Sequence, residues 1–292
     1  MPGQKAAEQD RPQRIILITG CSSGIGAAAA RTLRGRDWRV FATARRAEDV
    51  ERLRAAGFES LLLDYEDAAS IEEAAAAVLE RTGGRLDALF NNGAYAIPGA
   101  LEDMPTEALR QLFEANFLGW HTLTRAVLPA MRRQGAGRIV QCSSILGFIG
   151  MPYRGAYNAS KFALEGYSDT LRLELLGSGI HVSLIEPGPI ATRFTENALE
   201  NFLRIIGRDG IAASVHREAY EKRVARMQAG EKSLFKLPAR AVVKQVVHAV
   251  EAPRPKARYR ITVPTAAMAV AKRLLPTRAL DRVLTRAARS EE

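Results

Sequence analysis

Two side chains that could exchange a proton lie four residues apart near the middle of the chain, Tyr157 and Lys161. On a helix, positions i and i+4 share one face, so the lysine ammonium would lie beside the tyrosine phenol. A nearby cation favours the phenolate and lowers the phenol pKa from its usual value of about 10. Tyr157 is therefore a candidate general acid or base. Surface packing is the alternative interpretation of such a pair taken alone.

Ser144 stands thirteen residues before Tyr157, at the end of an apolar run that begins at Arg138. The run predicts a strand, and at the tip of a strand a serine hydroxyl can donate to a carbonyl oxygen. When a hydride adds to a carbonyl carbon, negative charge builds on that oxygen. Ser144 and Tyr157 together could stabilise and protonate it.

A glycine-rich turn near the N-terminus follows a second strand-like run, residues 15–19, and precedes an alanine-rich helix. The turn contains Gly20, Gly24 and Gly26. Between a buried parallel strand and a helix, such glycines let the backbone approach a pyrophosphate and direct free amides at its charge. The motif therefore indicates dinucleotide binding, with a purely structural turn as the alternative.

The end of the next expected strand, residues 39–44, bears on the choice of dinucleotide. Proteins that prefer NAD usually place a carboxylate there to bind the ribose 2′-hydroxyl. This chain has Arg45 and Arg46 instead. A guanidinium would pair with a 2′-phosphate, so NADP(H) is favoured over NAD(H), and the Ser23 hydroxyl could contribute. The alternative is that both arginines form the solvated start of a helix.

Six motifs, in register, resemble the short-chain dehydrogenase/reductase family over roughly residues 15 to 192. They are Thr19-Gly20-x-x-x-Gly24-x-Gly26, Asn91-Asn92-Gly93-Ala94, Asn116, Ser144, Tyr157-x-x-x-Lys161 and Pro187-Gly188. The glycine turn and residues 160–166 are similar to the branch with 17-beta-hydroxysteroid dehydrogenase type 1, retinol dehydrogenases and bacterial NADP-dependent aldehyde reductases. One departure is visible, since the family usually has Asn-Asn-Ala-Gly where this chain has Gly93 followed by Ala94.

The resemblance implies that Tyr157 is the acid or base and that Lys161 lowers its pKa and holds the nicotinamide ribose. It implies that Ser144 polarises the carbonyl and that Asn116 anchors a water linking Lys161 to solvent. The implied cofactor contacts are Gly20, Ser22, Ser23, Gly24, Ile25, Gly26, Arg45, Asp64, Asn92, Gly93, Tyr157, Lys161, Pro187, Gly188 and Thr192. Two alternatives stay open: Asn116 could be a helix-interior amide bonded to backbone, and Asp64 could cap the next helix.

Strand-like and helix-like segments alternate, which predicts an α/β fold with a doubly wound parallel sheet, a Rossmann fold of about seven strands with helices on both faces. Beyond residues 15–19 and 39–44, strands are expected at 60–63, 88–91, 138–144, 181–186 and 259–263. Expected helices cover 48–56, 70–82, 106–134, 157–176 and 239–251. Ligands bind such sheets at the carboxyl ends of the strands, so Gly20, Asn91, Ser144 and Pro187 should converge.

The expected alternation stops between residues 192 and 237, where the family carries its mobile substrate lid. Apolar side chains recur there at helical spacing: Phe194, Leu199, Phe202, Leu203, Ile205 and Ile206. Core packing is the alternative. Tyr95, Leu146 and Met151 are expected to contact substrate, which favours a hydrophobic carbonyl or alcohol such as a long-chain aldehyde, a retinoid or a steroid. His216 is expected to be exposed.

The 292 residues suit a tail at 1–13 expected to be disordered, one catalytic domain at 14–263 and a basic helical extension at 264–292. Only Cys21 and Cys142 occur, which predicts no disulfide framework and a reducing cytoplasm. The first residues lack an apolar stretch long enough for a signal peptide. The sequence indicates no metal site.

Most of the net charge of +10 lies at the C-terminus, where ten bases and one acid, Asp281, occur between residues 253 and 290. A helix at 266–275 could lie on an anionic membrane, and peripheral contact with the inner membrane surface is one interpretation of this pattern. A docked helix with a solvated basic face is the alternative. No nucleic-acid motif accompanies the charge.

These observations favour an NADP-dependent enzyme over a non-catalytic NADP-binding redox sensor or a membrane-surface adaptor on the same fold. The reason is that Asn116, Ser144, Tyr157 and Lys161 are all present. The resemblance also implies a homodimer or homotetramer formed through the helices that bear Asn116 and Tyr157.

Overall fold

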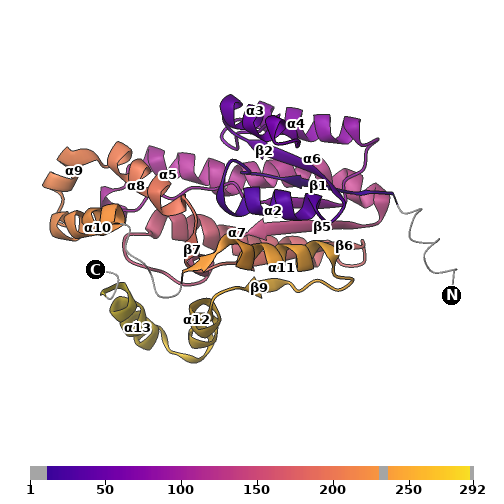
Figure 1. Ribbon diagram of the computed structural model, residues 1–292. Coiled ribbons are helices and arrows are strands. Elements are labelled where there is room, and N and C mark those ends of the chain that lie inside the picture. The colour runs from indigo at the N-terminus through magenta and orange to yellow at the C-terminus, as the bar shows by residue number, and fades with distance from the viewer. Residues whose placement is uncertain (1–11, 230–235, 290–292) are drawn as a thin grey trace.

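A seven-stranded parallel sheet lies at the centre of the computed structural model, which describes residues 12–229 and 236–289 (Figure 1). The spatial order is β3-β2-β1-β4-β5-β6-β9. The strands are parallel throughout, but their order in the sequence runs outwards in opposite directions from the boundary between β1 and β4. The strands are β1 (Arg14–Ile18), β2 (Trp38–Ala44), β3 (Glu59–Leu62), β4 (Ala88–Asn91), β5 (Gly137–Cys142), β6 (Ile180–Glu186) and β9 (Arg258–Arg260). The predicted doubly wound Rossmann fold is confirmed.

Helices cover both faces of the sheet, as predicted (Figure 1). On one face α2 packs against α11, and on the other α4 packs against α6, with α7 against β6. Alanines on the inner side of α2 are buried, which allows the helix to lie close to the sheet. The helices are α2 (Gly24–Arg34), α3 (Ala47–Ala55), α4 (Ala68–Arg81), α5 (Thr106–Phe113), α6 (Gly119–Gln134), α7 (Gly155–Glu174) and α11 (Ala239–Glu251).

Three local expectations differ from the structure. The helix expected at 106–134 contains a π-helical turn, η2 (Glu114–Leu118), between α5 and α6. Asp67 rather than Asp64 caps α4, because its carboxylate accepts hydrogen bonds from two amides of the first turn. The strand expected at 259–263 ends at Arg260, because Thr262 caps the next helix.

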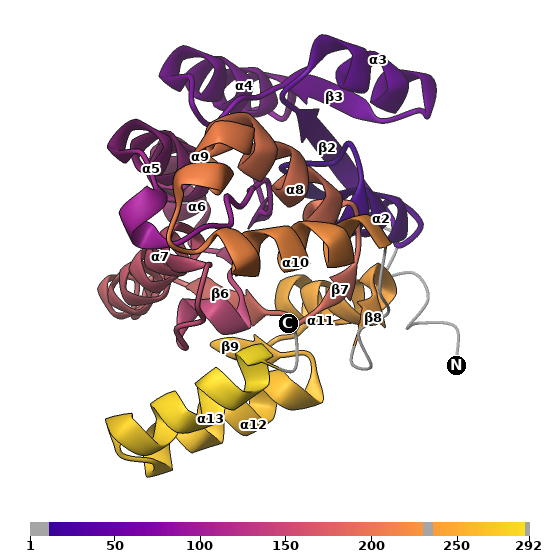
Figure 2. The same cartoon turned by 90° about the vertical axis from the view of Figure 1, so that its left-hand side faces the viewer.

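Three helices cover one end of the sheet, where the sequence predicted a lid (Figure 2). They are α8 (Phe194–Ile205), α9 (Gly207–Ala213) and α10 (Arg217–Ala229). The short strands β7 (Ile190–Ala191) and β8 (Leu237–Pro238) pair with each other beside the base of this segment. Residues 230–235 of the expected lid lie outside the described residues. His216 is packed rather than merely exposed, since its Nε2 lies 2.6 Å from Glu102 Oε1 and its ring contacts Tyr153.

The C-terminal helices α12 (Val263–Leu274) and α13 (Thr277–Arg289) follow β9 and extend away from the sheet (Figures 1 and 2). Residues 1–11 of the expected tail and 290–292 of the extension lie outside the described residues. Within 12–229 and 236–289, no helix is long and apolar enough to cross a bilayer. Cys21 and Cys142 are both buried and unpaired.

Candidate active site

Tyr157 and Lys161 lie one turn apart near the start of α7, and both are buried, with 8% and 0% of their surfaces exposed. The Lys161 ammonium donates to the Cys142 carbonyl oxygen, at 2.9 Å, and so ties α7 to the end of β5. Its Nζ lies 5.7 Å from the centroid of the Tyr157 ring. The predicted juxtaposition of the two side chains is therefore present.

Ser144 lies two residues beyond the end of β5, at the start of the short 3-10 helix η3 (Ile145–Gly147). Its Oγ accepts a hydrogen bond from the Leu146 amide, at 3.1 Å, which fixes the side chain at the helix start. The Ile145 amide donates to the Pro187 carbonyl oxygen, at 2.9 Å. The loop that carries Ser144 is thus joined directly to the segment that follows β6.

The protonation of the pair differs from the sequence-based expectation. Burial raises the pKa of the Tyr157 phenol, and a hydrogen bond with Ser144 only partly offsets this effect. Burial also lowers the pKa of Lys161 to about 8. The protonated form of Lys161 is therefore favoured only modestly near neutral pH. Because the packed chain excludes solvent from both groups, Tyr157 is a neutral phenol here, the form that donates a proton.

Asn116 is fully buried in the π-helical turn η2. Its side-chain Nδ2 donates to the Tyr95 carbonyl oxygen, at 2.8 Å, and its Oδ1 accepts from the Tyr95 backbone amide, at 3.1 Å. Its Nδ2 also lies 3.3 Å from Ser160 Oγ, on α7. The side chain is bonded to backbone, as in the alternative interpretation of this residue, and no contact with Lys161 is among the interactions of the described residues.

The glycine turn between β1 and α2 has room for backbone only. Gly20 and Gly24 adopt φ values of +66° and +58°, which residues with a side chain rarely adopt. A Cβ on Gly26 would lie 2.3 Å from the Gly20 carbonyl oxygen, and one on Gly20 would lie 2.7 Å from Gly93 Cα. A Cβ on Gly24 would lie 3.2 Å from Thr192 Cγ2. Thr192, predicted at the same site, is thus adjacent to the turn.

A threonine and an asparagine hold the glycine turn against the segment after β4. The Asn92 side chain donates to the carbonyl oxygens of Thr19, at 3.0 Å, and Gly20, at 3.3 Å. The Thr19 hydroxyl accepts from the amides of Asn92, at 2.9 Å, and Gly93, at 3.2 Å, and from the Tyr65 hydroxyl, at 2.8 Å. The position of Thr19 directly before Gly20 was the only sequence signal for its role.

The residues at the start of α2 fit a dinucleotide phosphate. Ser23 is the N-cap residue but makes no side-chain capping hydrogen bond, and the first turn contains no acidic residue. Its amides therefore keep the positive end of the helix available for an anion. Ser22 is exposed beside it, and Ile25 packs against the core. Arg45 is exposed just beyond β2.

The remaining predicted cofactor residues lie at neighbouring strand ends. A Cβ on Gly188 would lie 2.3 Å from Thr262 Oγ1, so a side chain at this position would clash with Thr262. Asp64 follows β3, and its Oδ1 accepts from the Glu66 amide, at 3.1 Å. The carboxyl ends of β1, β2, β3, β4, β5 and β6 thus carry predicted residues.

Besides Ser144 and Tyr157, three residues were predicted to contact substrate, and two of them, Leu146 and Met151, are joined through the Asn158 side chain. Leu146 packs with Tyr157 and with the lid residues Phe194, Ala198 and Met227. Met151 is bound through its backbone amide, which donates to Asn158 Oδ1 at 3.3 Å. Burial and the neighbouring Glu66 carboxylate raise the pKa of Tyr95, so its hydroxyl faces Glu66.

Two further residues of the site were not predicted. The ring of Trp120 lies under Lys161, with Nζ 4.1 Å from its centroid, and its Nε1 donates to the Gly93 carbonyl oxygen, at 2.9 Å. Glu165 is buried one turn beyond Lys161 on α7. The signal was helical spacing, because Trp120 and Glu165 stand four residues after Asn116 and Lys161.

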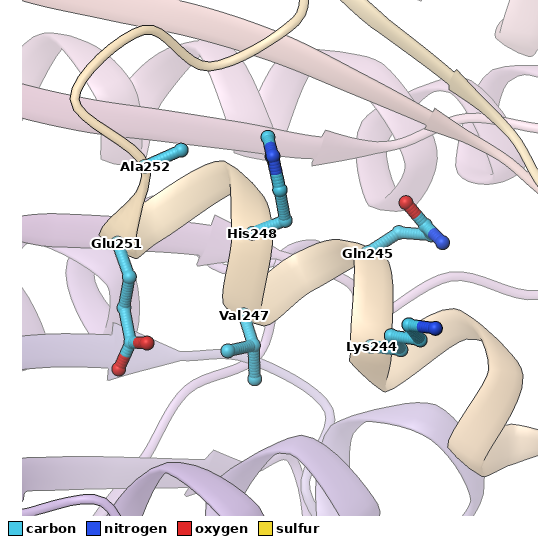
Figure 3. Close-up of a pocket in the computed structure, with 6 residues that line it drawn as sticks. All are labelled: Lys244, Gln245, Val247, His248, Glu251 and Ala252. Carbon is cyan, nitrogen blue, oxygen red and sulfur yellow. The ribbon is translucent and has the colours of Figure 1, made fainter.

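A cavity of about 350 Å³ lies elsewhere, on the surface of α11 (Figure 3). It is lined by Lys244, Gln245, Val247, His248, Glu251 and Ala252. The Glu251 carboxylate is engaged by Arg14, Arg36 and Trp38. None of these residues belongs to the site around Tyr157.

A parallel sheet with a glycine turn after its first strand, a buried serine after another strand and a buried tyrosine and lysine on the following helix is typical of a nucleotide-binding oxidoreductase. The family model for short chain dehydrogenases matches residues 14–202, and the chain belongs to this family. The Escherichia coli oxidoreductase YbbO is 44% identical over 273 residues, covering 93% of this chain and 94% of that protein. Human 17-beta-hydroxysteroid dehydrogenase type 1 is 36% identical over 262 residues, covering 84% and 76%.

Solved structures show the same fold. A short chain dehydrogenase/reductase from Burkholderia phymatum, in complex with NAD, superposes with a TM-score of 0.73 at 25% identity, covering 90% of this chain and 92% of that one. A variant of actinorhodin polyketide ketoreductase, with NADPH, gives a TM-score of 0.68 at 31% identity, covering 86% and 95%. Family members of this shape therefore occur with either dinucleotide.

Proposed function

We propose that the protein is an NADP(H)-dependent reductase or dehydrogenase acting on the carbonyl or alcohol carbon of a hydrophobic substrate. The observation that carries this proposal is the convergence of Ser144, Tyr157 and Lys161 at the carboxyl edge of the sheet, beside a glycine turn that has room for backbone only. The proposed catalytic domain spans 14–263, with a lid at 192–237 and an extension at 264–292.

The proposed mechanism assigns each side chain one task. In reduction Tyr157 donates its proton to the substrate oxygen, while the Ser144 hydroxyl donates a hydrogen bond to the same atom. Lys161 provides positive charge beside the phenol and stabilises it after the proton has left. The nicotinamide, when bound, supplies the hydride. Asn116 acts through the backbone of Tyr95 and through Ser160, which hold the segments on either side of the site.

Cofactor binding is assigned to the glycine turn and the strand ends around it. The proposed contacts are Gly20, Ser22, Ser23, Gly24, Ile25, Gly26, Arg45, Asp64, Asn92, Gly93, Pro187, Gly188 and Thr192. The α2 N-terminus would hold the phosphates, because its amides are not capped by a side chain.

The proposed substrate is an apolar aldehyde, retinoid or steroid-like compound, because the side chains around Tyr157 are Leu146, Phe194, Ala198 and Met227. The relative named as a hydroxysteroid dehydrogenase supports this class. The test is a panel of hydrophobic aldehydes, ketones and alcohols assayed by NADPH absorbance. Turnover of long apolar carbonyls in preference to short polar ones is expected, and the reverse preference would contradict the substrate class.

Arg45→Asp should weaken NADPH binding at least roughly 10-fold more than NADH binding, because a charge-assisted hydrogen bond to the 2′-phosphate contributes about 1.5–3 kcal/mol. The measurement is the Kd of each dinucleotide by fluorescence titration. Arg133→Asp makes the same charge change near the end of α6, which leads to the amino edge of the sheet, and should leave both Kd values unchanged. An unaltered NADPH to NADH ratio in Arg45→Asp would contradict the NADP(H) assignment.

Peripheral contact with an anionic membrane is proposed for the C-terminal helices. Val263, Val270 and Leu274 stand at helical spacing on α12 with 76%, 55% and 75% of their surfaces exposed. The neighbouring α13 carries exposed Arg278 and Arg282. Apolar surface with adjacent bases suits an anionic bilayer.

The protein should sediment with phosphatidylglycerol vesicles and not with phosphatidylcholine vesicles, and high salt should release it. Leu274→Asp should weaken binding, because it places a charge on the apolar stripe. Leu62→Asp, an equal change at the exposed end of β3, should not. Equal sedimentation of Leu274→Asp and the unmodified protein would contradict a membrane role for α12.

A homodimer or homotetramer in the cytoplasm is the proposed state, and light scattering measures the subunit count. Leu118 and Phe162, on the helical segments that carry Asn116 and Tyr157, are 41% and 40% exposed, which supports a partner there.

A non-catalytic sensor or adaptor is disfavoured, because such a protein has no need of a buried lysine beside a tyrosine.

A further inference from the structure

A cluster of five charged side chains connects α7 with β6 and β9, and two of its carboxylates are buried. It consists of Glu165 and Asp169 on α7, Glu186 at the end of β6, and Arg258 and Arg260 on β9. The side chains of Glu165 and Glu186 are 9% and 0% exposed. Carboxylates buried to this extent are costly unless they are paired, so each needs its counterion.

Arg258 is the centre of the cluster. Its two terminal nitrogens donate to both oxygens of Asp169, at 2.9 and 2.8 Å, and one of them also donates to Glu165 Oε2, at 3.0 Å. Its Nε lies 3.0 Å from Glu186 Oε1, an ion pair without hydrogen-bond geometry. Arg260 donates to the other Glu186 oxygen, at 3.3 Å. One guanidinium therefore serves three carboxylates.

Strand pairing explains why these groups meet. The register of β9 against β6 places Arg260 opposite Glu186 and Arg258 opposite Leu184. Glu186 directly precedes Pro187, which accepts the hydrogen bond from the loop that carries Ser144. The charged cluster is thus attached to the segment that leads into Pro187 and Gly188.

Glu165 connects the cluster to the catalytic residues. It stands one turn beyond Lys161 on the same face of α7. Its Oε1 has no hydrogen-bond partner in the part of the chain that the structure describes. A Cβ on Gly147 would lie 3.1 Å from this oxygen and 2.6 Å from Ser143 Oγ, so the carboxylate faces the loop around Ser144.

The charge of one group changes the pKa of the next, from Arg258 through Glu165 to Lys161. Burial lowers the pKa of Lys161 to about 8, and Cys142 and the negative charge of Glu165 oppose that fall. Burial raises the pKa of Glu165, and the neighbouring Ser143 and Arg258 oppose that rise. The groups that face Lys161 are Cys142, Tyr157, Trp120 and Glu165. Those that face Glu165 are Lys161, Asp169, Arg258, Glu186 and Ser143.

We propose that Arg258 and Glu165 are positioning residues for the active site: Arg258 holds Glu165 as a carboxylate, and Glu165 holds Lys161 as an ammonium beside Tyr157. The inference rests on the proposed roles of Tyr157 and Lys161. Neither Arg258 nor Glu165 touches the reacting atoms, so each acts through the charge of Lys161.

The direct test is a pH titration of Lys161 monitored by NMR of ¹³C-labelled lysine. The Lys161 signal is identified by its loss in Lys161→Arg. The midpoint is expected near pH 8 in the unmodified protein. In Glu165→Gln it should fall by roughly one pH unit or more, the usual effect of losing a close opposite charge. Glu174→Gln makes the same change at an exposed position of α7 and should leave the midpoint in place. Equal midpoints in Glu165→Gln and the unmodified protein would overturn the proposal.

Arg258→Lys tests the other half of the proposal and keeps one positive charge for folding. An ammonium cannot reproduce the fork that binds Asp169 and Glu165 together, so the Lys161 midpoint should fall between those of Glu165→Gln and the unmodified protein. A midpoint at the unmodified value would remove Arg258 from the proposed arrangement. The alkaline limit of kcat/KM should move with the midpoint in each variant. If Tyr157→Phe keeps full activity, the proposed function fails, whereas the Lys161 titration still decides the coupling.

Discussion

Tyr157→Phe is expected to lower kcat by about 10²- to 10⁴-fold on any carbonyl substrate that the panel identifies, the usual contribution of a general acid. The phenol is buried beside the Lys161 ammonium, and within the described residues no other hydroxyl except that of Ser144 is assigned to the substrate oxygen. The ring itself packs on Phe194, with centroids 5.5 Å apart, so phenylalanine preserves the packing. The measurement is steady-state NADPH oxidation.

The control for this prediction is Tyr167→Phe. Tyr167 lies further along the same helix, and its hydroxyl is 3.2 Å from His121 Nδ1 rather than near Ser144. The variant loses an equivalent atom and should retain kcat. The Kd for NADPH should be nearly unchanged in both variants. Undiminished turnover by Tyr157→Phe would remove the acid/base assignment.

Gly26→Ala is expected to weaken dinucleotide binding at least roughly 10-fold, equivalent to about 1.4 kcal/mol. The added methyl would lie 2.3 Å from the Gly20 carbonyl oxygen and 2.9 Å from its carbon. Both are backbone atoms that can move only if the turn opens, and overpacking of this kind typically costs about 1–3 kcal/mol in stability as well. The measurements are the Kd for NADPH and the thermal unfolding midpoint, Tm.

Gly166→Ala is the matched control. Gly166 lies on α7, with nothing within 4 Å of an added Cβ. Alanine there should raise the free energy of unfolding by about 0.5–1 kcal/mol, because glycine is a poor helix former. Dinucleotide binding should not change. An intact Kd in Gly26→Ala would contradict the role of the turn as a phosphate cradle.

Local features of the fold could be predicted because their causes are local. A continuous apolar run needs burial on two faces, which predicted β1, and the glycines that follow adopt backbone angles closed to other residues. Alternation of strands and helices then restricts the topology to a parallel sheet. The π-helical turn η2 was not predictable, because the apolar spacing of α5 continues into α6 without a break in pattern.

The partners of the site residues depend on contacts between distant segments. Helical spacing predicted that Lys161 lies near Tyr157, but not that its ammonium binds the Cys142 carbonyl oxygen and lies over Trp120. The family resemblance implied a water-anchoring role for Asn116, whereas packing against the segment after β4 gives its amide to Tyr95. Each partner comes from another part of the chain.

The sequence by itself determined the class of fold, the glycine turn and the order of the candidate catalytic residues, because propensity, periodicity and backbone freedom act over a few neighbouring residues. Only the tertiary structure decided the electrostatics of the site. Burial raises the pKa of Tyr157 despite the nearby lysine, and Arg258 reaches Glu165 across 93 residues of chain. The energy of a charge depends on the solvent and counterions that the packed chain leaves around it, and the spacing of residues along the sequence does not specify these.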